Sequence, residues 1–526
     1  MEIVQKIIKN LIKARIKTPA DLASFKRGVS KKYKIPCPSN IELLKAYHKL
    51  IRNKRTVRSE KIENLLKTRP VRSLSGIINI SVLTKPYPCP GKCLYCPQEK
   101  GIPKSYLSGE PAVERAKRLD YDPYLQVKKR IETLELEGHP TDKIELRTVG
   151  GTWSYYPKKY QVWFIKRCFE AGNGRISKNL NNAQKKNEKA KHRMVGLSIE
   201  TRPDFINPSE IKHLRWLGVT MVELGVQSIY DDVLKLNLRG HGIKETILAT
   251  KLLKDAGFKV LYQMMPNLPG SNLKRDEKMF EELFKNPDFQ PDLLKIYPCA
   301  LLKKAPLYKV YLKGEYKPYS EKALINLLKK IKKKIPYYVR IQRITRDIPS
   351  PKILKGGAKI SNLRQILIEK MKSEDWKCKC IRCREVREKY DPKEKIYLLR
   401  QDYEASGGKE IFLSYESKNQ TKLYSLLRLK IPSQYYENTL GSILPALEKA
   451  AIIREIHTYG KMVPIGGKKL APQHRDFGKK LIKEGEKIAR KEFGSKKIAV
   501  ISAIGARDYF KKLGYKLKDT YMVKIL

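Results

Sequence analysis

The chain has 526 residues, of which 41% are hydrophobic, and 111 Lys and Arg against 54 Asp and Glu give it a formal net charge of +57. This length exceeds one ordinary domain, so we expect two or three domains with buried cores. An excess of one charge sign favours a nucleic-acid partner over a thermophilic surface, on which both signs rise together. The sequence has neither an apolar run of about 18 residues nor a signal-peptide core, which predicts a cytoplasmic protein without a membrane span.

Residues 1–72 are expected to form a basic helical arm. Apolar residues such as Ile7, Ile8 and Leu11 recur at helical spacing, and lysines fill the other face. A second capped helix and a basic loop are predicted in TPADLASFKRGVSKKYKIP. We interpret the arm as RNA-binding, with a solvated helical cap as the alternative. Its candidate RNA contacts are Lys6, Lys9, Lys13 and Arg15.

Residues 73–355 alternate short β-branched runs with amphipathic helical stretches. Strands are predicted in GIINISVL, KIELRTVGG, RMVGLSIE, MVELGVQS, KVLYQMMPNLPG and LLKIYPC. Six β-then-α repeats indicate a parallel, barrel-like sheet whose chemistry lies at the C-terminal ends of its strands. The polar segment GNGRISKNLNNAQKKNEKAKHR, between two of these strands, is expected to be a mobile loop.

Three cysteines follow the first predicted strand, in PYPCPGKCLYCPQEKG. Cys89, Cys93 and Cys96 are too close for a useful disulfide loop but can converge on one metal centre. A zinc knuckle would need a fourth ligand, and none follows nearby. CxxxCxxC after the first strand of such a barrel resembles the radical S-adenosylmethionine (SAM) superfamily. The resemblance implies that the three thiolates hold a [4Fe–4S] cluster whose fourth iron stays open to SAM.

The resemblance continues at later strand ends. It implies that Gly150 and Gly151, in GGTW, let the backbone approach the methionine amino group of SAM. It also implies that Glu200, in SIETRPD, and Gln227, in ELGVQS, face the ribose or methionine of SAM. A structural role is the alternative for each residue taken alone.

Residues 356–390 carry a second cysteine triplet, in CKCIRCRE. CxCxxC in a linker predicts a structural zinc site at Cys378, Cys380 and Cys383, because zinc pins loops that have no core of their own. Free thiols are the alternative, and the sequence does not indicate a fourth ligand.

Residues 391–526 form another predicted α/β unit of strand runs, a helix in RDFGKKLIKEGEKIARKEFG, the strand KIAVISA and a small helix in GARDYFKKLGYK. This order resembles the GCN5-related N-acetyltransferase fold, whose helix N-terminus receives the pyrophosphate of coenzyme A. Gln473 and Gly478 match the QxxGxG pattern of that fold, but Asp476 stands where the pattern has glycine. We expect this carboxylate to weaken acetyl-CoA binding, by on the order of 1 to 3 kcal/mol, although Lys479 and Lys480 offset part of the repulsion.

One protein family joins both halves, the tRNA-uridine acetyltransferases that form the catalytic subunit of Elongator. The chain resembles this family over nearly its whole length, through KPYPCPGKCLYCP, YDPY, GGTW, REIHTYG and YMVKIL. The resemblance implies transfer of a carboxymethyl group to carbon-5 of the wobble uridine of tRNA, with acetyl-CoA and SAM as cosubstrates. The SAM-derived radical would take hydrogen from the acetyl methyl group, and the carbon radical would add to carbon-5.

The same resemblance implies further site residues. Lys143 would contact acetyl-CoA and act in catalysis together with Tyr509, while Phe510 replaces a tyrosine of the family and so cannot be its proton donor. The strand that flanks the pantetheine arm would contribute Ile456, His457, Thr458 and Tyr459. A basic cleft would hold the splayed anticodon stem-loop, with candidate contacts at Arg340, Arg343 and Arg346.

Two other function classes stay open from the sequence. A protein lysine acetyltransferase with an iron–sulfur domain kept for structure would acetylate basic peptides without cleaving SAM. An RNA-binding scaffold would bind tRNA and consume neither cofactor. A homodimer and Elongator-like partners are both compatible with the sequence.

Overall fold

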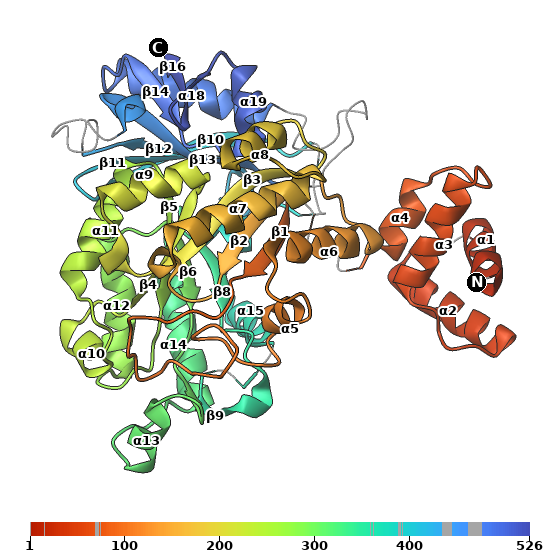
Figure 1. Ribbon diagram of the computed structural model, residues 1–526, viewed down its shortest axis with the longest axis horizontal. Helices are drawn as coiled ribbons and strands as arrows, with labels where there is room; N and C mark the ends of the chain where they lie inside the picture. Colours follow the sequence, from red (N-terminus) through yellow and green to blue (C-terminus); the bar gives the residue numbers. More distant parts are fainter. Residues whose placement is uncertain are drawn as a thin grey trace.

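The computed structural model describes residues 2–14, 16–68, 73, 75–357, 359–360, 362–387, 391, 393–433, 444–460 and 476–526. Two predicted site residues, Arg15 and Gln473, lie outside the described residues. The chain forms a small helical unit, a curled parallel sheet and a second sheet packed against it (Figure 1). In the described part of the chain, no helix is both long and apolar enough to cross a membrane.

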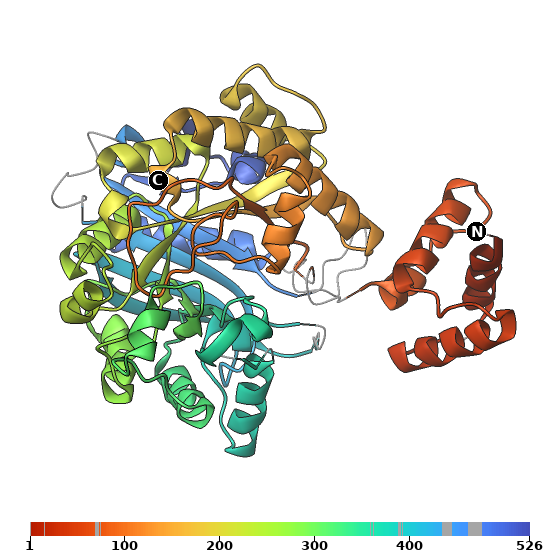
Figure 2. The same cartoon turned by 60° about the horizontal axis from the view of Figure 1, so that its bottom comes forward.

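The N-terminal unit contains four helices, α1 (Glu2–Lys13), α2 (Pro19–Tyr33), α3 (Asn40–Arg52) and α4 (Glu60–Leu66). Capping boxes at Thr18 and Ser39 fix the starts of α2 and α3. The helices share a small core around Leu43 and Tyr47. In both views the unit stands apart from the rest of the chain, beside α6 (Figures 1 and 2). The two helices expected here are confirmed, and two more follow them.

The expected parallel barrel-like sheet is confirmed and has seven strands in the order β1-β2-β3-β4-β5-β6-β8. The strands are β1 (Ile78–Leu83), β2 (Lys143–Val149), β3 (Arg193–Thr201), β4 (Met221–Gln227), β5 (Lys259–Met264), β6 (Leu293–Ile296) and β8 (Arg340–Ile344). The prediction of six strands missed β8, because this strand alternates polar side chains that face a cavity with apolar ones.

Helices connect these strands and cover the outside of the sheet (Figure 1). They are α5 (Pro111–Lys117), α6 (Pro123–Leu136), α7 (Lys158–Asn173), α9 (Pro208–Leu217), α10 (Asp231–Leu236), α11 (Ile243–Asp255), α12 (Leu273–Lys285) and α14 (Glu321–Lys334), whereas α13 (Leu307–Leu312) lies beyond one end of the sheet. A short antiparallel pair, β7 (Ala300–Leu302) and β9 (Ile353–Gly356), lies at one end. The helices α15 (Leu363–Ser373) and α16 (Ile381–Arg384) then lead to the second sheet.

The segment expected to be a mobile loop between α7 and β3 is instead partly helical, as α8 (Leu180–Asn187). The polar composition predicted a loop, but the segment is packed: Leu180 and Ala183 are buried, and the Asn187 side chain accepts a hydrogen bond from Met194 N at 2.8 Å. Glu188, just after α8, forms ion pairs with Arg507 and Lys511 of the second sheet's last helix, at 3.1 Å and 2.6 Å. The insertion therefore joins the two halves.

The second sheet has the order β10-β11-β12-β13-β14-β16-β15. Its strands are β10 (Ile396–Ala405), β11 (Gly408–Ser417), β12 (Leu423–Ile431), β13 (Ala450–Thr458), β14 (Lys497–Val500), β15 (Lys516–Lys518) and β16 (Tyr521–Ile525), and its helices are α18 (Phe477–Lys491) and α19 (Arg507–Lys511). The expected α/β unit is confirmed. The parallel register of β13 with β14 ends at Ile453 and Val500, so β13 continues to Thr458 paired with β12 and without β14 beside it.

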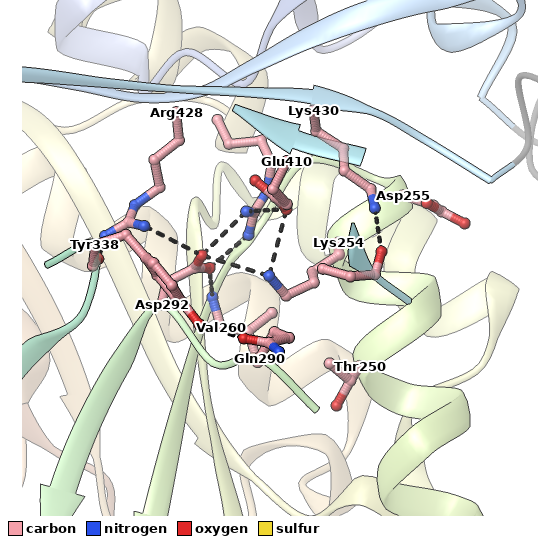
Figure 3. Close-up of polar contacts among 12 residues, drawn as sticks. Thr250, Lys254, Asp255, Val260, Gln290, Asp292, Tyr338, Glu410, Arg428 and Lys430 are labelled. Carbon is pink, nitrogen blue, oxygen red and sulfur yellow. Dashed lines mark hydrogen bonds and ion pairs between the residues drawn. The ribbon is translucent and has the colours of Figure 1, made fainter. Parts of the chain in front are cut away.

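Paired charges are buried where the two sheets meet (Figure 3). Asp292, just before β6, accepts from Arg454 of β13 at 3.0 Å and from Val260 N at 2.8 Å, and Lys254 of α11 lies 3.5 Å away. Arg454 also donates to Glu410 of β11. Because breaking such a network would strand buried charges, it holds β13 in a fixed position on the barrel.

Candidate active site

A cavity of about 1630 Å³ runs through the inside of the half-barrel and continues to β13 and the start of α18. At one end it reaches the cysteine loop after β1 and the C-terminal ends of the parallel strands. At the other it reaches the strand starts, where Lys259 contacts Glu455 of β13 at 3.3 Å and Arg340 donates to Tyr459 at 3.3 Å. β2 alone spans seven residues, or about 20 Å at roughly 3.3 Å per residue. Two chemically different sites therefore share one interior.

The first cysteine triplet lies at the C-terminal end of the barrel. Cys89, Cys93 and Cys96 all line the cavity. Arg239 donates to Cys93 Sγ at 3.5 Å. Burial raises the pKa of this thiol, but the positive charges of Arg239 and Arg202 outweigh burial, so the pKa of Cys93 is lowered. Burial and the nearby Cys93 raise the pKa of Cys96 to about 12, which a bound cation would reverse.

The residues around the triplet fit an anionic metal–sulfur group. A Cβ atom at Gly91 would lie 2.7 Å from Arg202 Nη1 and 3.5 Å from Cys93 Sγ, so only glycine leaves the thiols and guanidinium this close. Thiolates are the soft ligands that iron–sulfur clusters take, and the two guanidinium groups balance the charge of such a group.

The two glycines after β2 have different roles. A Cβ atom at Gly150, whose φ is 129°, would lie 2.0 Å from Thr84 Oγ1, so this glycine keeps β1 and β2 close together. Gly151, at φ 91°, lines the cavity, and the atom nearest to a Cβ added there would be Lys104 O, at 3.8 Å. Only Gly151 therefore offers backbone to a ligand.

Glu200 and Gln227 line the cavity at the ends of β3 and β4. Glu200 accepts from Tyr106 Oη, Lys295 Nζ and Gln263 Nε2, each at 3.1 Å. Burial raises the pKa of Glu200, but Lys295 outweighs it, so the pKa is lowered and the carboxylate is ionised. Gln227 takes a φ of 71°, and its carbonyl accepts from Met265 N at 2.8 Å.

The sequence reasoning missed two charged residues that order this end of the cavity, Lys295 and Arg239. Lys295 lies on β6, which is otherwise apolar, and forms ion pairs with both Glu200 and Glu223. A lysine inside a buried parallel strand was the available signal, because such strands are normally continuous apolar runs. Nothing local in the sequence pointed to Arg239.

The opposite end of the cavity is built around Gly478, in the first turn of α18. A Cβ atom there would lie 3.3 Å from Tyr509 Oη, 3.7 Å from Ile456 Cδ1 and 3.8 Å from Thr458 Oγ1, so these groups surround one open position. The buried Nε2 of His457 has no hydrogen-bond partner among the described residues, and burial lowers the pKa of His457 to about 4. A glycine cradle beside an unpartnered polar atom fits a ligand such as the thioester arm of a coenzyme.

The other residues predicted at this end are distributed unevenly. Lys143, Tyr459, Lys479, Tyr509 and Phe510 line the cavity. The Phe510 ring nevertheless packs in the core of the second sheet, whereas Tyr509 is 39% exposed and burial together with Asp476 raises its pKa. Lys480 is not among the lining residues; its Nζ lies 6.0 Å from the Phe477 ring.

Asp476 precedes α18 with a φ of 54°, in the left-handed region that glycine favours. Its side chain is 62% exposed and pairs with Lys479 at 3.1 Å. Exposure to water and pairing with Lys479 both weaken the repulsion between the Asp476 carboxylate and a bound phosphate. The expected loss of acetyl-CoA binding free energy therefore falls to the lower end of the range of about 1 to 3 kcal/mol.

The second cysteine triplet lies just outside the barrel. The Sγ atoms of Cys378, Cys380 and Cys383 lie within 4.8 Å of one another, and Lys332 Nζ approaches Cys383 Sγ at 3.8 Å. Three thiols at this separation fit one thiophilic ion.

The predicted basic residues fall in two places. Lys6, Lys9 and Lys13 are exposed on α1, opposite its buried face, and do not line the cavity. The three arginines of the predicted cleft line the cavity but carry carboxylate partners: Arg340 pairs with Glu385, Arg343 with Asp347 and Arg346 with Glu110.

Comparison with known proteins identifies the family of the chain. Residues 87–283 match the radical SAM superfamily, and residues 291–373 match a radical SAM C-terminal domain. The tRNA uridine(34) acetyltransferase of Methanocaldococcus infernus is 44% identical over 100% of this chain and 98% of its own length. Human Elongator complex protein 3 is 38% identical over 99% of this chain and 96% of its own. A solved structure of the archaeal Methanocaldococcus infernus Elp3, with an N-terminal deletion of residues 1–46, covers 86% of this chain and 100% of that one, with 43% identity and a TM-score of 0.74.

Proposed function

Because the chain belongs to the family of tRNA uridine(34) acetyltransferases and Elongator complex protein 3, we propose that it builds a carboxymethyl group on carbon-5 of the wobble uridine of tRNA. The observation that carries the proposal is the single cavity that joins the Cys89, Cys93 and Cys96 loop to Gly478. An acetyltransferase that only modified lysine side chains would not need an interior continuous with a radical SAM site.

Radical SAM proteins use SAM and a [4Fe–4S] cluster, which together supply a radical that abstracts hydrogen. Cys89, Cys93 and Cys96 would hold the cluster, and Arg239 and Arg202 would balance its charge. Gly151 would admit the SAM backbone, and the ionised Glu200, held by Lys295 and Tyr106, would orient its polar groups. Gln227 completes this end of the cavity.

Acetyl-CoA would bind at the other end, where Gly478 leaves room for the pantetheine arm beside Ile456, His457, Thr458 and Tyr509. His457 is neutral at pH 7 because burial lowers its pKa to about 4, so it can donate or accept a hydrogen bond without adding charge. Lys143 lies at the same end of the cavity, at the start of β2, where it would meet the acyl group.

The tRNA would bind through the basic cavity wall and the exposed lysines of α1. A net charge of +57 supports an RNA partner. Zinc at Cys378, Cys380 and Cys383 would be structural, because these thiols lie in a linker between the two sheets. We propose that the enzyme is cytoplasmic and acts either as a homodimer or together with Elongator-like partners.

The test is anaerobic reconstitution of the cluster, followed by reaction with tRNA, SAM and acetyl-CoA in the presence of a one-electron reductant such as dithionite, and mass spectrometry of the nucleosides. We expect 5-carboxymethyluridine only when all three are present. Acetylation of basic peptides with no SAM-dependent nucleoside would support the lysine acetyltransferase alternative and contradict the proposal.

A further inference from the structure

Two arginines without an assigned role, Arg364 of α15 and Arg382 of α16, line the cavity beside Arg340. Arg364 Nη2 donates to Ile341 O at 3.2 Å, and Arg382 Nη1 donates to Gln342 O at 2.8 Å. Both carbonyls belong to β8, the last strand in the order of the sheet, and the pairing register with β6 skips Gln342. The open edge of the half-barrel therefore gathers two guanidinium groups on one part of the cavity wall.

Carboxylates neutralise the neighbouring arginines but not these two. Arg340 pairs with Glu385 at 2.8 Å, and Arg343 pairs with Asp347. Counting only residues that the structure describes, no carboxylate oxygen lies within 4.0 Å of the Arg364 or Arg382 nitrogens. Both side chains are partly withdrawn from water. Cations that lack a carboxylate partner favour an anionic ligand, because a desolvated charge that is not balanced is costly.

The second cysteine triplet holds Arg382 in this position. α16 has four residues, and Arg382 lies within it between Cys380 and Cys383. The Ile381 backbone N–H donates to Val339 O at 2.9 Å, which ties α16 to the start of β8. A helix this short is not stable alone, so the thiol triplet and this bond direct Arg382 toward the cavity.

We propose that Arg364 and Arg382 form a binding site for a backbone phosphate of the RNA substrate. The assignment rests on the proposed function, which brings an RNA strand to this cavity. A guanidinium fork matches phosphate geometry, and two forks at one place can hold one phosphodiester. Acetyl-CoA is the other ligand that carries phosphate, but its diphosphate is expected to bind at the start of α18, beside Lys479.

The test compares the parent chain with the double variant Arg364→Gln/Arg382→Gln. Binding of an anticodon stem-loop is measured over a range of salt concentrations, and acetyl-CoA binding by calorimetry. We expect RNA affinity to fall on the order of tenfold, and the slope of log affinity against log salt to drop by about 0.7 to 0.9, the loss of one phosphate contact. Acetyl-CoA affinity should stay at the parent value. The control Lys372→Gln/Lys377→Gln removes the same charge from exposed positions outside the cavity and should retain the parent slope.

Each outcome decides the proposal. A parent-like slope in the arginine variant would overturn it, and so would a loss confined to acetyl-CoA binding, which would assign the phosphate to the coenzyme. If the glutamine variant does not fold, Arg364→Lys/Arg382→Lys keeps the charge but removes both forks. That variant should keep the slope and bind RNA about threefold more weakly, and parent affinity would contradict the site. A parent chain that binds no stem-loop at all would instead contradict the proposed function.

Discussion

The substitution Asp476→Gly should tighten acetyl-CoA binding. The Asp476 carboxylate lies at the start of α18, where a coenzyme diphosphate would approach, and its φ of 54° shows that glycine would fit the backbone without change. Because the side chain is 62% exposed and paired with Lys479, water and this partner screen its charge. Even at about 4 Å, two like charges in water repel by only about 1 kcal/mol. We therefore expect a gain of about 1 kcal/mol, or roughly fivefold in affinity.

Calorimetric titration at low and high salt measures this gain, which should shrink as salt rises because the Debye length falls to about 3 Å at 1 M. SAM binding should not change. The control is Asp375→Gly, since Asp375 is also exposed and has a φ of 52° but does not line the cavity. Equal acetyl-CoA affinities for Asp476→Gly and the parent would refute the reasoning, as would the same gain in the control.

Three further changes test other parts of the account. Cys93→Ser should abolish 5′-deoxyadenosine formation but leave tRNA binding within about twofold, because the RNA-binding charge lies elsewhere; deoxyadenosine release at the parent rate would contradict the cluster site. Deleting residues 2–68 should flatten the salt dependence of tRNA binding by roughly 0.7 to 0.9 per lost phosphate contact, and an unchanged slope would show that the helices are only a cap. Asp292→Asn should lower the free energy of unfolding at pH 7 by about 3 to 5 kcal/mol in denaturant titrations, because Arg454 would lose one of its two buried carboxylate partners. Burial raises the pKa of Asp292, but the charges of Arg454 and Lys254 outweigh burial, so the pKa of this carboxyl is lowered in the folded state. The stabilisation is therefore complete above the unfolded-state pKa of about 3.9 and is lost as the pH falls through the folded-state pKa. A loss that persisted unchanged under strongly acidic conditions would contradict the assignment.

The sequence predicted the elements whose packing leaves a local trace. Six barrel strands were predictable because strands buried on both faces read as apolar runs between helical patterns. β8 was missed because Arg340, Gln342 and Arg343 face a polar cavity and interrupt that run. α8 was missed because Leu180 and Ala183 are its only buried apolar residues, while Gln184 and Asn187 hold it through polar side chains that composition assigns to a loop.

The candidate site shows the same limit. The cysteine loop and Gly478 were predictable, because thiol spacing and a glycine at a helix start have chemical meaning within a few residues. Arg239 and Lys295 were not, because their roles depend on neighbours brought in from other strands. The continuity of the cavity between the two ends also depends on how the sheets pack, to which the paired charges around Asp292 and a shared apolar core both contribute.

The central claim is that both ends of the cavity serve one reaction, and acetyl-CoA with a deuterated methyl group tests it most directly. In an anaerobic reaction with tRNA, SAM and a one-electron reductant, the account predicts one deuterium atom in 5′-deoxyadenosine and two in the carboxymethyl group of the modified uridine. Deoxyadenosine without deuterium, formed alongside modified uridine, would contradict it.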